Sequence, residues 1–123
     1  MATKVALELI AAGTSVPAAT PKANAVIGTP RGVTTGYGGM LDWRITNVGA
    51  LGAPCVIMFQ TSPDGLNWFD LEAAYSADLL ANTVTQGPSI PLRMAAMNVR
   101  AIAYGNTNSQ CLVEAWLEHV TGL

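Results

Sequence analysis

Hydrophobic and polar residues alternate one by one along much of residues 37–123. In segment 110–120 the polar-side positions are Glu114, Trp116 and Glu118, and segments 41–46 and 97–104 repeat the pattern. Because successive side chains of a β-strand point to opposite faces, this period of two predicts strands that bury one face. The faces predicted to be buried contain Leu41, Trp43 and Ile45 in the first segment and Cys111, Val113, Ala115 and Leu117 in the last.

A β-hairpin is predicted at residues 55–71. The run CVIMFQT, residues 55–61, is apolar on both faces, which is typical of a central strand covered on both sides. The turn Ser62, Pro63, Asp64 and Gly65 follows, with Pro second and Gly fourth, as a type I turn prefers. Residues 66–71 are expected to form the returning strand.

The remaining segments favour an all-β domain. Residues 82–92 have strand character that Gly87 and Pro88 interrupt, and residues 73–81 fit either one helical turn or a loop. No helical segment is long enough for a crossover between parallel strands. About six to eight short strands at near-regular spacing therefore predict an antiparallel β-sandwich or a jelly-roll-like fold.

Residues 1–36 differ in composition from the rest of the chain, because they are rich in Ala, Thr, Gly and Pro and contain no aromatic residue. Val5, Leu7 and Leu9 alternate with polar or small residues, and several prolines follow. Since Pro favours edges and turns, we expect an extended N-terminal arm or edge strands at 1–36 and a sandwich domain at 37–123. Val5, Leu7 and Leu9 are then candidate interface residues. This division predicts that removing residues 1–22 leaves the sandwich folded and weakens association.

Composition changes the picture of the surface. Charged residues make up 11% of the chain, against roughly 25% in an ordinary soluble domain. This favours a surface covered by identical copies or by a larger assembly, and the alternative is a soluble domain with an uncharged polar surface. The net charge of −2 and the absence of a basic run argue against nucleic-acid binding.

Neither a membrane span nor a signal peptide is predicted. No apolar stretch approaches the roughly 18 residues of a span, and Glu8 interrupts the apolar run that follows Lys4. We therefore expect a protein that is kept soluble or is released only by lysis.

Catalytic chemistry has little support in the sequence, and we expect no enzyme, no metal and no cofactor. The single histidine, His119, has no nucleophile or acid at a fixed spacing, and the GYGG segment at 36–39 lacks the Lys of a phosphate-binding loop. Glu114 and Glu118 would lie about 13 Å apart on a strand, too far for paired acid–base work. A hydrolase would need other carboxylates that meet only in the fold.

The two cysteines, Cys55 and Cys111, lie within apolar runs and are expected to be buried and free. A disulfide between them would require neighbouring strands, and the sequence leaves that alternative open.

The tryptophans divide into different roles. Trp43 shares the apolar side of its strand and is expected in the core, whereas Trp116 lies on the polar side and is the leading candidate for a covered interface. Trp68 follows a turn, where binding residues are common. Tryptophans that stack on sugar rings would instead make the domain a carbohydrate-binding module.

The stretch Ser62-Pro63-Asp64-Gly65-Leu66-Asn67-Trp68, flanked by two strands, resembles the S-x-D-G-x-N-W hairpin of small β-sandwich structural proteins in tailed-bacteriophage virions. Residues 43–47 and 98–101 extend the resemblance over roughly residues 37–120. It implies a homo-oligomeric, non-enzymatic virion protein of the capsid decoration, cement or tail-accessory kind, assembled in the host cytoplasm. Its expected partners are other capsid or tail proteins. A carbohydrate-binding β-sandwich with a glycan partner is the alternative, because such modules contain a similar hairpin.

Overall fold

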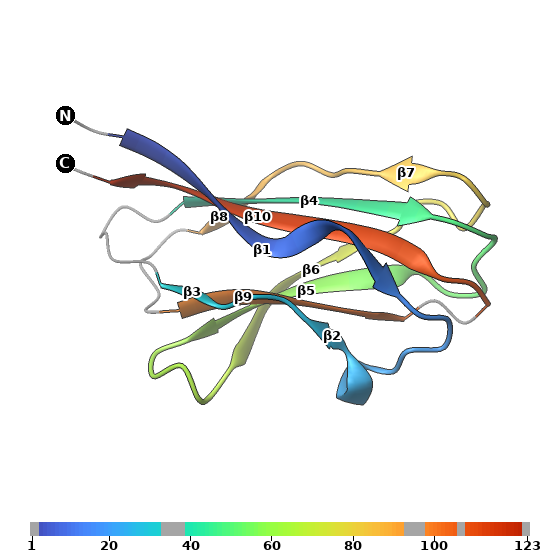
Figure 1. The fold of residues 1–123 in the computed structure, drawn as a ribbon, viewed down its shortest axis with the longest axis horizontal. Helices are drawn as coiled ribbons and strands as arrows, with labels where there is room; N and C mark the ends of the chain where they lie inside the picture. Colours follow the sequence, from blue (N-terminus) through green and yellow to red (C-terminus); the bar gives the residue numbers. More distant parts are fainter. Residues whose placement is uncertain (1–2, 33–38, 93–97, 106–107, 122–123) are drawn as a thin grey trace.

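Ten β-strands in the described part of the chain form two antiparallel sheets that pack face to face (Figure 1). The computed structural model describes residues 3–32, 39–92, 98–105 and 108–121, and within these the side chains from Ala6 to Glu118. The all-β antiparallel sandwich that the alternation predicts is therefore confirmed.

Sheet A is the upper layer in Figure 1. In spatial order it contains β1 (Thr3–Val16), β10 (Cys111–Thr121), β4 (Gly39–Asn47) and β7 (Val84–Thr85), and β8 (Ile90–Leu92) pairs with the start of β4. Cys111, Val113, Ala115 and Leu117 of β10 are almost completely buried, while Trp116 lies on the opposite face. The face assignment made from the sequence is thus confirmed for this strand.

Sheet B is the lower layer. In spatial order it contains β2 (Val26–Ile27), β9 (Asn98–Gly105), β5 (Cys55–Ser62) and β6 (Phe69–Tyr75), and β3 (Arg31–Gly32) pairs with the start of β9. A short 3-10 turn, η1 (Lys22–Asn24), precedes β2. The apolar strand β5 lies between β9 and β6, so the predicted central strand and hairpin are confirmed.

The core lies between the inward faces of the two sheets. Leu41 and Ile45 of sheet A pack in one cluster with Ile57 and Phe59 of sheet B, and all four are fully buried. Trp43 packs against this cluster, as its position beside Leu41 and Ile45 predicts. A Cβ atom at Gly87 would overlap the Trp43 ring, so the absence of a side chain at Gly87 gives the ring its place.

Both cysteines are buried and free, as predicted, and they belong to different sheets. A hydrogen bond with the Cys111 thiol, together with burial, raises the pKa of the Cys55 thiol. The Cys55 thiol therefore stays protonated at neutral pH, and both buried cysteines pack as small hydrophobic groups.

Residues 76–83 form a loop, which resolves the alternative left open for 73–81. β6 continues to Tyr75, and the loop is then held by the buried Asn47 amide. Asn47 Nδ2 donates to the carbonyl oxygens of Asp78 and Leu80 at 2.7 and 3.2 Å and to Thr83 Oγ1 at 2.9 Å. These bonds satisfy the buried amide and fix the loop to the end of β4.

The N-terminal segment supplies edge strands, as one of the two alternatives for residues 1–36 predicts, and it does not stand apart from the sandwich as an arm. β1 pairs with β10 along its length, and Leu9, Ile10 and Val16 lie in the core at 2% exposure or less. β2 and β3 are edge strands of sheet B. The aliphatic residues of this segment supply core area without any aromatic side chain.

Removal of residues 1–22 should therefore abolish cooperative folding rather than weaken association alone. A fully buried Leu, Ile or Val side chain contributes roughly 1.5–3 kcal/mol, and the deletion removes three of them together with the strand that pairs with β10. Circular dichroism and thermal melting of the truncated chain would measure the effect. A retained β-sheet spectrum with a cooperative melt would contradict it and restore the arm interpretation.

Candidate functional site

Trp116 lies on the outer face of sheet A, as the sequence predicts. It is half-buried and stands between Glu8 of β1 and Asp42 of β4 in the strand register. Its ring nitrogen donates a long hydrogen bond of 3.5 Å to Glu114 Oε2. The indole thus has one polar contact and a partly open apolar surface, which a partner could cover.

The other candidate interface residues, Val5, Leu7 and Leu9, do not form a shared surface. Leu9 is 1% exposed and belongs to the core of its own chain, so its assignment to an interface is wrong. The apolar side of β1 faces its own sandwich, since Leu7 lies opposite the buried Leu117, and the register irregularity between Glu8 and Ile10 turns Ile10 inward as well. Leu7 packs partly buried against the core, and the side chain of Val5 lies outside the described ones.

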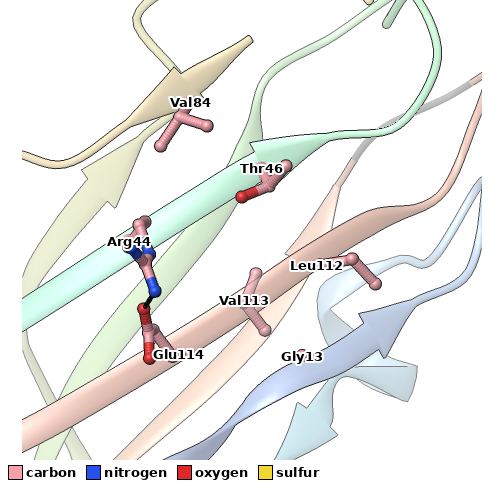
Figure 2. A pocket seen from close by; sticks show the side chains of 7 residues that line it. All are labelled: Gly13, Arg44, Thr46, Val84, Leu112, Val113 and Glu114. Atoms are coloured by element: carbon pink, nitrogen blue, oxygen red, sulfur yellow. Dashed lines mark ion pairs between the residues drawn. The ribbon is translucent and has the colours of Figure 1, made fainter. Parts of the chain in front are cut away.

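A hollow of about 230 Å³ lies on the outer face of sheet A (Figure 2). Between Ile10 and Thr14 the register of β1 shifts against β10, and Gly13 adopts a φ of 78° there. The lining residues come from four strands of sheet A: Gly13, Arg44, Thr46, Val84, Leu112, Val113 and Glu114.

The floor of this hollow contains one ion pair, between Arg44 and Glu114 (Figure 2). The Glu114 side chain is 14% exposed and the Arg44 side chain 50%. Since each charge has the other as its partner and the remaining walls are mainly apolar, the hollow can seat an apolar side chain. It offers no pairing of a nucleophile with a base.

The loop between β5 and β6 is organised by one carboxylate. Asp64 accepts hydrogen bonds from the backbone N–H groups of Asn67 and Leu66, both at 2.8 Å, and from Asn67 Nδ2 at 2.7 Å. These bonds, the backbone bond from Asn67 foremost, hold the pKa of Asp64 well below its usual range. The sequence predicted that the returning strand begins at Leu66. It begins at Phe69 instead, because these bonds hold residues 66 and 67 in the loop.

A chain of polar contacts crosses the outer face of sheet B. Arg100 Nε donates to Gln60 Oε1 at 2.8 Å, and Gln60 Nε2 donates to Asp70 Oδ1 at 2.8 Å. Lys22 Nζ lies 2.6 Å from Asp70 Oδ2, and this bond lowers the pKa of Asp70. Sequence reasoning missed the chain of contacts because its members come from η1, β5, β6 and β9, with no common spacing.

The three tryptophans lie in separate places. Trp43 packs on the core, and Trp116 lies on the outer face of sheet A. Trp68 follows the β5–β6 loop, and the Arg100 guanidinium stands 4.3 Å from the centre of its ring. One face of Trp68 is therefore occupied by a cation–π contact. The tryptophans share no platform on which a sugar chain could stack.

Large apolar side chains gather along β6 and the loop before it. We call these residues the β6 surface: Leu66 is 83% exposed, Phe69 60%, Leu71 43% and Tyr75 55%. Single exposed apolar residues are ordinary on protein surfaces, but four of them along one edge strand and its loop make this edge a candidate contact site. The sequence predicted the hairpin and did not identify this surface, because residues 66–71 were expected to be an ordinary paired strand.

Within residues 3–32, 39–92, 98–105 and 108–121, no cluster of three His, Cys, Asp or Glu residues could hold a metal ion. The side chain of His119 and most of the GYGG segment lie outside the described part. No helix in the described ranges has the length and apolar character to cross a membrane.

Gly65 provides a test of the loop geometry. Its φ is 76°, and an added Cβ would lie no closer than 3.5 Å to Asn98 Nδ2, so backbone conformation alone opposes a side chain. Gly65→Val should lower the free energy of unfolding by about 1–2 kcal/mol, and Gly65→Asn by less, because Asn tolerates this conformation. Urea unfolding of both variants would measure the difference. If both variants were as stable as the wild type, residue 65 would not have the positive φ described here.

Acid should weaken the same loop. Since the folded-state pKa of Asp64 lies below its unfolded value, its contribution to stability is present at neutral pH and is lost as pH falls from about 5 to about 2. Asp64→Asn should be less stable than the wild type at pH 7, and the gap should narrow in acid. Urea midpoints across this pH range would show it. A constant gap would mean that the carboxylate charge is unimportant to the loop.

Comparisons with known proteins give the fold and no family. No family model matches the sequence, and no curated protein matches it. Among solved structures, a chain from the structure of infectious bursal disease virus strain Gx aligns with 97% of this chain at a TM-score of 0.55 and 8% identity. The match covers 32% of that viral chain, so this protein spans about a third of its length. At this identity the similarity establishes a shared β-sandwich fold alone.

Proposed function

We propose that this chain is a non-enzymatic structural protein of a bacteriophage particle, which binds the capsid or tail lattice as a decoration, cement or head–tail accessory protein. The observation that carries the proposal is the β6 surface, with Leu66, Phe69 and Tyr75 each more than half exposed on a chain of which 11% is charged. Such a surface is costly in water and favours a protein that works while covered.

The polar groups of the described chain support a structural role. Asp64 organises its loop, Asp70 pairs with Lys22, and Glu114 pairs with Arg44. An active site usually keeps charged groups converging on a cleft with shifted pKa values. Here the shifted carboxylates, Asp64 and Asp70, are exposed and are used in local hydrogen bonds.

Two likenesses point to a virus particle. The S-x-D-G-x-N-W hairpin at residues 62–68 resembles that of small virion proteins of tailed phages. The neighbour of similar fold comes from a structure of a virus, although of a different kind, and the likeness is one of fold. Together with the apolar β6 surface, these likenesses favour a lattice of other virion proteins as the partner.

The proposal predicts that the chain is present in purified particles at a fixed copy number and that purified protein rebinds particles that lack it. Leu66→Ser with Phe69→Ser should weaken rebinding about ten-fold or more, because these side chains supply apolar contact area. Leu80→Ser is the matched control, since Leu80 is 65% exposed but lies outside the β6 surface. Co-sedimentation and mass spectrometry would provide the measurements.

Absence of the chain from particles would contradict the proposal. If that absence were accompanied by sugar-dependent changes in tryptophan fluorescence, the carbohydrate-binding alternative would replace it.

A further inference from the structure

The two edges of sheet A are protected against pairing with another strand. β1 is irregular at two places, and its Glu8 and Leu9 carbonyl oxygens already accept from Arg31 Nε at 2.9 Å and from Thr29 N at 2.8 Å. The opposite edge consists of β7 and β8, which have two and three residues, with Pro91 inside β8. Short strands, bulges and prolines are the usual means of blocking edge-to-edge association.

The edges of sheet B are unequal. On one side β2 and β3 have two residues each. On the other side β6 has seven residues without a proline and one register irregularity, at Leu71, and among the described residues only β5 pairs with it. β6 is thus the long edge that the fold leaves open.

Cross-strand rows on the outer face of sheet B indicate which strand would fit beside β6. One row contains Tyr104, Val56 and Tyr75, and the row beside it contains Ile102, Met58 and Ala73. Both rows are apolar and end at β6. A strand that extends them should place apolar residues opposite Tyr75 and Ala73 and no acid opposite Glu72, because like charges directly opposite one another are destabilising.

β6 of a second copy meets these requirements in two registers, and the one centred on Ala73 pairs residues 71–75, whereas the one centred on Ala74 pairs only residues 73–75 of the strand. In a two-fold antiparallel pair centred on Leu71, Asp70 would face Glu72 twice, and in one centred on Glu72 the two Glu72 side chains would face each other. Centred on Ala73, Leu71 faces Tyr75 twice and Glu72 faces Ala74, so no charges meet. Leu71 has no partner on β5, because the register shifts there, and it is 43% exposed.

We propose that β6 pairs with β6 of a second copy of this chain in a two-fold antiparallel arrangement centred on Ala73. The paired edges join sheet B of both copies into one continuous sheet and cover Leu71 and Tyr75. This inference deepens the proposed function and rests on it, since it names the surface through which the virion protein forms its oligomer.

The test compares two double variants by light scattering coupled to gel filtration. The 123-residue chain of 12.8 kDa should elute at about twice that mass. Leu71→Lys with Tyr75→Lys places like charges opposite each other twice and should give a monomer. Leu71→Lys with Tyr75→Glu loses similar apolar area but places opposite charges together, and its dimer dissociation constant should be about ten-fold lower than that of the first variant. Circular dichroism and melting temperature establish that both variants are folded.

A cysteine cross-link checks the register independently. Ala73→Cys should form a disulfide-linked dimer on oxidation with glutathione disulfide, because the two Ala73 positions face each other across the axis. Ala12→Cys, on the exposed bulge of β1, should not, and the wild type should not because Cys55 and Cys111 are buried.

A wild-type monomer at high concentration, or equal association of the two double variants, would overturn the inference. Particle binding is measured separately: a chain that forms this dimer but is absent from particles would contradict the proposed function and leave the β6 pair intact.

Discussion

The contact between the inward faces of four central strands, β4 and β10 of sheet A and β5 and β9 of sheet B, holds the rest of the structure in place. Each strand supplies every second residue to one buried layer, including Ile45, Val113, Phe59 and Ala101. This alternation fixes which residues of these four strands face outward. The loops, the edge strands and the polar contacts are attached to these four strands.

The same alternation explains what could be predicted from the sequence. A strict period of two in β10 is enough to place Trp116 outside and Leu117 inside, and the turn residues are enough to locate the β5–β6 hairpin. The burial of both Leu9 and Ile10 could not be predicted, because a register irregularity in β1 puts two consecutive residues on the inward face. The contacts of Arg100 with Gln60 and Trp68 join residues distant in sequence, and only the fold brings them together.

The low charge and the exposed apolar area of this molecule have the same effect, because both make its surface less costly to cover. Several of the charges that it has are used within the chain, as in the pairs of Arg44 with Glu114 and Lys22 with Asp70. Surface ion pairs of this kind add little stability, but they neutralise charge where a neighbouring molecule would otherwise have to desolvate it. Such internal pairing lowers the desolvation cost of the contact with other proteins that the proposed function requires.

The bonds between residues 28–31 and the two sheets have a consequence for how large an assembly can grow. Gly28 N donates to Ala101 O of sheet B, and Thr29 N donates to Leu9 O of sheet A, so this crossing segment seals one side of the sandwich. A molecule with one sealed side and one open edge has a valence of one for strand addition. Among the described strands β6 alone is a long open edge, so the proposed strand addition there would end at a pair and would not continue along the sheet.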